Sequence, residues 1–436
     1  MQELMRNIEW KFTDRKVTAW GGMRMFKEFL DKTGIREELR RSDMPEPQSN
    51  RGYDPVVMIE SFWVSVWLGG MKFSHTAMVR FDEGLKAVFN WNNLPCVSTY
   101  TRFFKRFSRE KVDHCFGSIN HWFFGQMPQR TLTIDLDSSV ITRHGNQEGS
   151  RIGYNPRRPG RPSHHPLMAF VADLRMVAHS WLRPGNTGSG NGSREFLAET
   201  IDILGHHKIG LVRADAGFFD GEFLKYMEGR QLPYIITVRM NRIIKEKMQN
   251  ARGWIRIDEG IECAELTYQA GSWETARRII VVRQLVEERP KACGKYLFDM
   301  RDYRYQAWVT NTPLPPAEVW RLYRGRADAE NRIEELKYDF GIEGFCLREF
   351  YATEAAFRCV MIAYNLISLF RQVILSAKVQ PRLASIRFKC FAIGSWLGKM
   401  YRNPVLRLSL AHQRRPWFIG LFTKIEDFSW NIPVQT

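Results

Sequence analysis

Three acidic residues stand where metal-dependent chemistry on phosphate esters needs carboxylates. Asp137 ends an apolar, strand-like segment, Asp215 ends a second one, and Glu330 lies within a helix-like segment. In phosphoryl transfer the attacking and leaving oxygens must be stabilised in line, and two Mg²⁺ ions about 4 Å apart do this when carboxylates hold them. The pattern therefore predicts that Asp137, Asp215 and Glu330 are catalytic residues and metal ligands.

Two of these positions have a rival nearby. Asp135 precedes Asp137 by two residues, so both side chains face the same side of the strand. We favour Asp137 because it stands at the strand end, where a polar group can leave the core; Asp135 then supports the site or stabilises the turn. Glu334 lies on the same helical arc as Glu330 and competes with it. Asp215 has no close rival, although capping the next helix is an alternative role for it.

A helix that advances about 100° per residue brings four side chains around the third acid onto one face. These four residues, Tyr323, Arg326, Glu330 and Lys337, fall within an arc of about 60°. We expect Arg326 and Lys337 to contact DNA phosphates, and Tyr323 to stack or hydrogen-bond along the same strand. For any single pair, a surface salt bridge about one or two turns long is the alternative.

The charge balance of the chain is one-sided. Its 64 Lys and Arg residues exceed its 47 Asp and Glu residues, which leaves a formal net charge of +17. Such a surplus suits binding to the polyphosphate backbone of DNA. A basic loop after the first acidic strand is expected to hold that backbone, with a solvated loop as the alternative. This loop carries Arg157, Arg158 and Arg161.

Composition narrows the class of protein further. A hydrophobic content of 44% excludes a disordered or fibrous chain. The cysteines and histidines show no zinc-like spacing, and carboxylate ligands favour Mg²⁺, with Mn²⁺ as a substitute. No secretory signal is recognisable, so we expect a cytoplasmic protein. Residues 58–71 are too short to span a bilayer and 357–375 contain charged side chains, so both are expected to be core helices.

Residues 1–125 are dense in aromatic side chains and follow a helical pattern. A short helix that begins after Ser98 would carry Arg102 and Lys105 on its polar side and phenylalanines on the other. This is typical of the recognition helix of a helix-turn-helix motif, and a basic helix packed in a bundle is the alternative. We therefore expect residues 1–125 to be a helical DNA-binding region.

From residue 126 the pattern changes to that of an α/β protein. Alternating residues at 130–137 predict a strand, and 167–173 with 176–182 predict a hairpin. A Gly-rich bend, a helix, a strand, a second helix and a last strand at 233–238 follow. Three strands, helix, strand, helix, strand is the order of an RNase H-like mixed sheet flanked by helices. Residues 126–238 are thus expected to form the first part of such a core.

The rest of the chain divides into three parts. Residues 239–312 contain short β-like pieces and are expected to form a β-rich insertion. Residues 313–345 complete the core with one long helix, which begins at Pro315 and carries the third acid. Residues 346–436 are expected to form a helical, basic C-terminal region.

The segment from Tyr323 to Lys337 matches the motif Y-x-x-R-x-x-x-E-x-x-x-x-x-x-K without a gap. Further blocks are Ile134-Asp-Leu-Asp-Ser-Ser-Val140, Gly153-Tyr-Asn-Pro156 and Arg183-Pro-Gly-Asn-Thr187. With these motifs the chain resembles the DDE transposases of bacterial insertion sequences, in the clan that carries this last catalytic motif. The resemblance runs from about residue 130 to 345, and more loosely into both flanks.

The resemblance implies a transposase that binds the terminal inverted repeats of its element as a homodimer. It further implies Mg²⁺-dependent cleavage and strand transfer into double-stranded target DNA, with hairpin ends as intermediates. An aromatic residue of the insertion, Trp254 or Trp273, would hold a flipped base, with core packing as the alternative. The resemblance also implies that the protein is bacterial, is associated with the nucleoid and does not bind a membrane. The alternative functions are a nuclease that never joins DNA and a DNA-binding descendant that no longer cuts.

Overall fold

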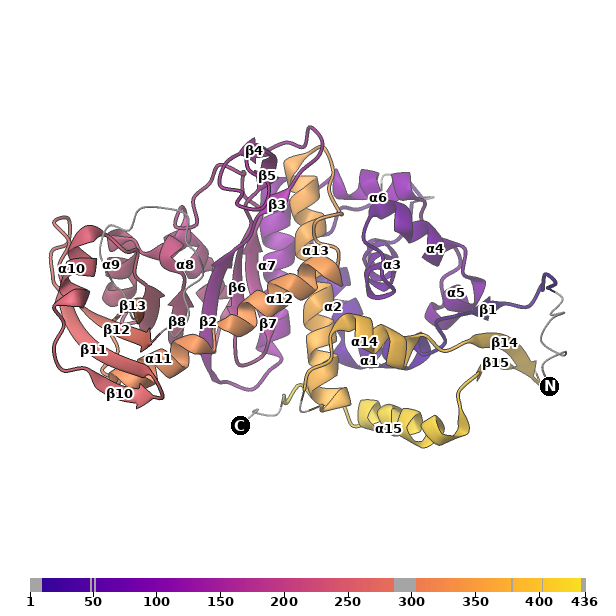
Figure 1. Cartoon of the computed structure of the whole chain (residues 1–436). Coiled ribbons are helices and arrows are strands. Elements are labelled where there is room, and N and C mark those ends of the chain that lie inside the picture. Colours follow the sequence, from indigo (N-terminus) through magenta and orange to yellow (C-terminus); the bar gives the residue numbers. More distant parts are fainter. Residues whose placement is uncertain are drawn as a thin grey trace.

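The computed structural model describes residues 10–47, 49–50, 52–285, 303–377, 379–401 and 403–432. The molecule is elongated, with a central α/β layer, a β-rich lobe at one end and a helical body at the other (Figure 1). Both ends of the chain contribute to the helical body.

Five strands form one end of the largest sheet, in the order β7-β6-β2-β8-β9, with β7 at the edge. Strands β2, β8 and β9 are parallel, and β6 runs antiparallel between β2 and β7. With two crossover helices, this topology is the RNase H-like core that the order of elements predicts. The strands are β2 (Thr131–Ser138), β6 (Leu167–Val171), β7 (Met176–Trp181), β8 (Lys208–Ala214) and β9 (Tyr234–Thr237).

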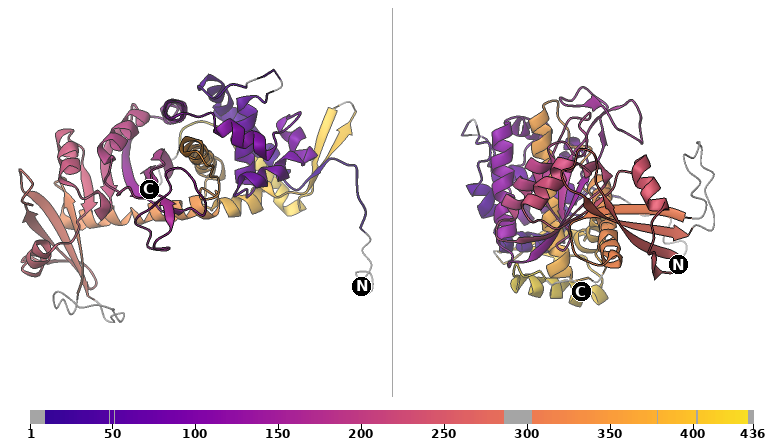
Figure 2. Two further views of the ribbon diagram at one scale, coloured as in Figure 1. Left: turned by 90° about the horizontal axis from the view of Figure 1, so that it is seen from above. Right: turned by 90° about the vertical axis from the view of Figure 1, so that its left-hand side faces the viewer.

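Helices cover both faces of this sheet, which explains why β6 is apolar throughout instead of alternating. Figure 2 shows α7, α8 and α9 on one side, and α11 and α12 on the other. The helices are α7 (Arg109–Gly125), α8 (Ser193–Leu204), α9 (Gly221–Gly229), α11 (Pro316–Arg324) and α12 (Ala327–Tyr338).

The β-rich insertion extends the same sheet. Strand β13 pairs antiparallel with β9, and β12, β11 and β10 follow, so that the described residues form a sheet of nine strands. The insertion is therefore held to the core by backbone hydrogen bonds, and residues 286–302 of it lie outside the described residues. Its elements are α10 (Arg242–Gln249), β10 (Ile255–Asp258), β11 (Ile261–Tyr268), β12 (Arg277–Leu285) and β13 (Tyr303–Thr310).

The helix α13 (Phe350–Phe370) joins the N-terminal helices to the sheet. The indole Nε1 atoms of Trp63 and Trp67 donate to the carbonyls of Cys359 and Ala363, at 2.9 and 3.1 Å. Residues 350–375 are long and apolar enough to cross a membrane, yet 89% of an apolar 18-residue window within them is buried inside the protein. The N-terminal helices are α1 (Met23–Thr33), α2 (Ile35–Arg41), α3 (Pro55–Trp67), α4 (Thr76–Arg80), α5 (Glu83–Phe89) and α6 (Val97–Phe104).

The C-terminal region contains a β-hairpin, which the expectation of a helical region from 346 to 436 did not include. Strands β14 and β15 pair with each other, and the short strand β1 near the N-terminus adds to β14. Another small sheet, of β3, β4 and β5, precedes β6. These elements are β1 (Val17–Thr18), β3 (Ile141–Thr142), β4 (Arg151–Ile152), β5 (Pro162–His164), α14 (Leu383–Ile386), β14 (Ser395–Met400), β15 (Asn403–Leu408) and α15 (Arg415–Glu426).

The edge strand β7 depends on a side chain of α13 for its hydrogen bonds. The buried amide of Asn365 accepts from the N–H of Val177 and donates to its carbonyl, both at 2.8 Å. Asn365→Leu would leave both backbone groups without a partner. We expect the free energy of unfolding to fall by about 2–4 kcal/mol, measured by urea denaturation. Asn93→Leu, at an exposed position, should change it by less than about 0.5 kcal/mol. Equal stabilities would contradict this role of Asn365.

Candidate active site

Asp137 and Asp215 emerge side by side from the sheet. Strands β2 and β8 are parallel, and Leu136 pairs with Ala214, so the residue after each pair lies at the same sheet edge. The carboxylate of Asp215 accepts from the N–H of Gly217 at 2.8 Å. A Cβ atom at Gly217 would lie 2.9 Å from the Asp215 carboxylate and 2.6 Å from Ser189, so only glycine fits this turn.

The third acid lies on a helix that differs from the expected one. A turn at Gly325 and Arg326 separates α11 from α12, where the sequence predicts one continuous helix. Arg213 of β8 donates to the carbonyl of Leu322, and the N–H of Arg326 bonds instead to the carbonyl of Tyr323 at 2.9 Å. The guanidinium also needs glycine at 325, because a Cβ there would be 2.7 Å from Arg213 Nη1. The arginine of β8 thus interrupts the α-helical bonding.

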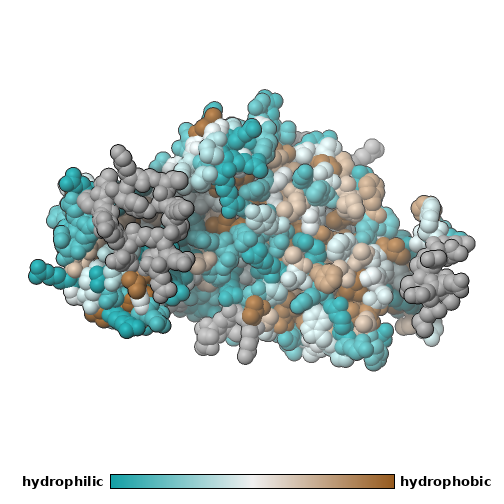
Figure 3. Space-filling view, viewed as in Figure 1, coloured by the Kyte–Doolittle hydropathy of each residue, from teal (hydrophilic) through white to brown (hydrophobic). Residues whose placement is uncertain are grey.

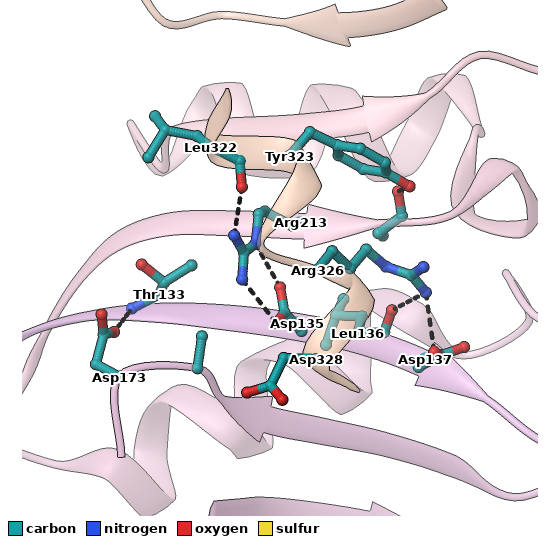
Figure 4. A network of polar contacts seen from close by, with 12 residues as sticks. Thr133, Asp135, Leu136, Asp137, Asp173, Arg213, Leu322, Tyr323, Arg326 and Asp328 are labelled. Atoms are coloured by element: carbon teal, nitrogen blue, oxygen red, sulfur yellow. Dashed lines mark hydrogen bonds and ion pairs between the residues drawn. The ribbon is translucent and has the colours of Figure 1, made fainter. Parts of the chain in front are cut away.

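Arg326 forms an ion pair with Asp137 inside the protein (Figure 4). Its Nη2 atom lies 3.0 Å from Asp137 Oδ2 and donates to the carbonyl of Leu136 at 3.3 Å. Burial raises the pKa of Asp137 to about 6; Arg326 opposes the rise, whereas the nearby charges of Asp215 and Glu330 add to it. The three acids therefore act on one another electrostatically.

Asp135 is bound to a different partner. Arg213 Nε and Nη2 donate to its two carboxylate oxygens at 2.6 and 2.8 Å, and both side chains are buried (Figure 4). Its oxygens are thus engaged within the fold, whereas Asp137 stands beside Asp215. The other rival, Glu334, pairs with Arg382 at 2.9 Å on the surface. Within the described part of the chain, Glu330 is exposed and makes no ion pair.

The other residues of the Y-x-x-R-x-x-x-E-x-x-x-x-x-x-K motif are mostly covered by protein. The hydroxyl of Tyr323 accepts from Thr237 Oγ1 at 2.6 Å and donates to the carbonyl of Ala214. Lys337 Nζ donates to the carbonyl of Val140 at 3.0 Å and pairs with Glu343 at 3.5 Å. Burial lowers the pKa of Lys337. Their contact with DNA stays a prediction, and in the free protein these side chains fasten α11 and α12 to the sheet.

The remaining predicted DNA contacts lie on the surface in three places. The arginines of the basic loop are exposed near β4 and β5, and Arg157 is close enough to help lower the pKa of Lys337. Arg102 and Lys105 lie on α6, where Lys105 pairs with Glu349 at 3.0 Å. Trp254, in the insertion, is half-buried under the guanidinium of Arg283, 4.2 Å from the ring centroid. Of these groups, the basic loop acts electrostatically on the motif residue Lys337, and the front face around α12 is largely hydrophilic (Figure 3).

Arg183 is a component of the site that residue types alone did not reveal. Its buried Nη1 donates to the carbonyls of Gly188, Ser189 and Asn191, at 3.2, 3.3 and 2.8 Å. The loop so gathered reaches the acids, because Ser189 Oγ lies 2.9 Å from Ser138 Oγ. The Gly-rich bend after Arg183 in the sequence was the available signal.

The donor set fits a hard divalent cation. Carboxylate oxygens are the ligands that Mg²⁺ and Mn²⁺ prefer. Burial is the main cause of the raised pKa of Asp137, and the charges of Asp215 and Glu330, which a cation would offset, add to it. Among the described residues, however, no three His, Cys, Asp or Glu side chains are close enough to hold an ion as they stand. Asp137 and Asp215 follow paired residues of β2 and β8, and a metal site that included Glu330 would need its side chain to approach them.

An RNase H-like sheet with two strand-end aspartates and a glutamate on the covering helix defines a polynucleotidyl transferase of the DDE class. The chain belongs to the family described as transposase DDE domain group 1, whose model matches residues 2–430. It is therefore a DDE transposase, and enzymes of this kind generally use divalent metal ions.

Comparison with solved structures gives a distant match. The chain is similar to the piggyBac transposase in the cryo-EM structure of its synaptic complex with hairpin DNA, with 13% identity and a TM-score of 0.45. The match covers 86% of this chain and 81% of the other. No protein of curated function matches the sequence.

The roles of the two strand aspartates can be separated by stability. Asp135→Asn weakens the buried pair with Arg213, and Arg213→Ala leaves Asp135 as an uncompensated charge. We expect Arg213→Ala to lower the free energy of unfolding by about 3–5 kcal/mol, measured by chemical denaturation. Arg382→Ala, which breaks only a surface pair, should cost at most about 1 kcal/mol. If Asp135→Asn kept full stability but lost metal binding, the ligand would be Asp135.

Proposed function

We propose that the protein is a cut-and-paste transposase that binds the terminal inverted repeats of an insertion sequence, cleaves them and joins them to target DNA. One observation carries this proposal: Asp137 and Asp215 stand together at the ends of β2 and β8, and Glu330 on the covering helix lies within electrostatic reach. The family supports transposition as the outcome of that chemistry.

In this proposal Asp137, Asp215 and Glu330 hold two Mg²⁺ ions, for which Mn²⁺ can substitute. Bound metal would supply the positive charge that stabilises the attacking and leaving oxygens on phosphorus. Glu330 is exposed and without an ion pair among the described residues, so its carboxylate is free to turn toward the two aspartates. Arg326 keeps Asp137 paired in the free protein and would turn to a DNA phosphate when that pairing is replaced.

The basic loop exposes Arg157, Arg158 and Arg161, and Arg157 acts electrostatically on Lys337, which suits a loop that holds the incoming DNA backbone. We further propose that two copies of the chain hold two element ends, that cleavage passes through hairpin ends, and that Trp254 supports a flipped base. The proposed setting is the bacterial cytoplasm, at the nucleoid.

The alternatives differ in their products. The protein would be incubated with linear DNA that carries the element's ends, a target plasmid and Mg²⁺. Joined product supports the transposase, cleavage without joining supports a nuclease, and a mobility shift alone supports a silent DNA-binding protein. The DNA that flanks the gene would identify the ends through paired inverted repeats.

Replacement of any one acid should separate cleavage from binding. We expect Asp137→Asn, Asp215→Asn and Glu330→Gln each to reduce cleavage at least about 100-fold, because each removes a carboxylate that would hold the metal ions at the reacting phosphate. Binding to the ends should remain, as measured by electrophoretic mobility shift. Glu334→Gln is the matched control on the same helix and should retain cleavage. A variant that still cuts would remove that residue from the site.

The pKa of Asp137 predicts how metal use depends on pH. With that pKa raised to about 6, the carboxyl binds a proton below pH 6, and a proton competes with the metal. The Mg²⁺ concentration for half-maximal cleavage should therefore rise about fivefold from pH 6 to pH 5. Arg326→Gln removes the charge that lowers this pKa. In this variant the required Mg²⁺ concentration should therefore begin to rise at a higher pH. Identical pH profiles for Arg326→Gln and the control Arg382→Gln would contradict this coupling.

A further inference from the structure

The last part of the chain has an unusual charge pattern. Between Arg371 and Ile425 there are eleven Lys and Arg residues and no Asp or Glu. In the chain as a whole, acids are nearly three quarters as frequent as Lys and Arg. This stretch has no acid of its own to neutralise its charge, and it forms α14, the hairpin β14–β15 and most of α15.

Several of these cations form ion pairs with acids of the same chain. Arg371 pairs with Glu335 and Arg382 with Glu334, both acids of α12. The hairpin differs, because Lys399 and Arg407 are exposed and make no ion pair within the described part of the chain. Arg15, which precedes β1, is likewise exposed and without an ion pair there.

The three-stranded sheet of β1, β14 and β15 has a solvent-exposed face on which several side chains pack against one another. Trp396 pairs with Arg407 across the hairpin, so both side chains lie on this face. The guanidiniums of Arg407 and Arg15 stack on the Trp396 ring, 4.6 and 5.0 Å from its centroid. Gly398 makes room for this packing, because a Cβ there would be 2.2 Å from Arg407 Nη1 and 2.8 Å from the indole. The arginines are thus held by an aromatic ring and not by an acid.

We propose that this face, with Arg15, Lys399, Trp396 and Arg407, binds the backbone of duplex DNA outside the catalytic site. Uncompensated cations that are already ordered suit the phosphates of the DNA backbone. A second copy of the chain is a poorer partner, because it also carries a net charge of +17. The sheet lies at the end of the molecule away from the insertion (Figures 1 and 2). The acids and this face would therefore hold different parts of one long duplex.

The inference rests on DNA as the substrate of the proposed function, but its test needs no cleavage. The triple variant Arg15→Gln, Lys399→Gln, Arg407→Gln would be compared with wild type by fluorescence anisotropy without metal, on a mixed-sequence duplex of about 60 base pairs, roughly 200 Å long. Near 0.2 M salt we expect affinity to fall about tenfold to a hundredfold, and the salt dependence to decrease by up to about 3 units of slope.

The matched control removes the same charge elsewhere. Arg24→Gln, Arg40→Gln, Lys225→Gln replaces three exposed cations that pair with acids, and should change affinity less than about threefold if only net charge is lost. On a duplex of about 15 base pairs, too short to reach both sites, the two triple variants should bind alike.

A second measurement does not depend on the variants. In the wild-type protein, hydrogen exchange of the backbone amides in β14 and β15 should slow when the long duplex is added. Unchanged exchange together with unchanged affinity of the triple variant would overturn the proposal. If the triple variant instead loses self-association in sedimentation while its DNA affinity stays, the face is an interface between copies. If the wild-type protein binds the long duplex as expected but does not cleave DNA, the result counts against the proposed function and not against this face.

Discussion

The buried bond between Asp135 and Arg213 is the interaction on which the site depends. It joins the two strands whose ends carry Asp137 and Asp215, and the same guanidinium holds the carbonyl of Leu322 in the covering helix. One arginine thus sets the distance between sheet and helix. A buried charge is stable only when it is fully paired, so this geometry is strongly determined.

The position of Arg326 follows from that geometry. Arg213 donates a hydrogen bond to the carbonyl of Leu322, and the helix turns at Gly325. This turn brings the side chain of Arg326 next to Asp137 at the end of β2. Asp137 is buried and is affected by the charges of Asp215 and Glu330, and the guanidinium of Arg326 offsets part of this repulsion.

The long helix α13 links this site to the rest of the molecule. It packs on β7 through Asn365 and on α3 through the indoles of Trp63 and Trp67. The insertion is joined to the opposite side of the sheet by the pairing of β13 with β9. Three bodies of very different composition are thus fixed to one sheet, which suits an enzyme that holds DNA at several points.

Local patterns in the sequence were sufficient to predict the order of the core strands, the crossover helices and the strand-end positions of Asp137 and Asp215. The reason is that hydrophobic periodicity and turn residues are local properties of the sequence. The hairpin β14–β15 was missed, since its short apolar strands resemble helix segments. Only the tertiary structure distinguished Asp135 from Asp137, because the deciding partner, Arg213, lies far away in sequence. It also placed Arg326 on Asp137 and broke the predicted helix at Gly325. The sequence determined which groups could do the chemistry, and long-range pairing of buried charges gave Asp135 and Asp137 different partners, Arg213 and Arg326.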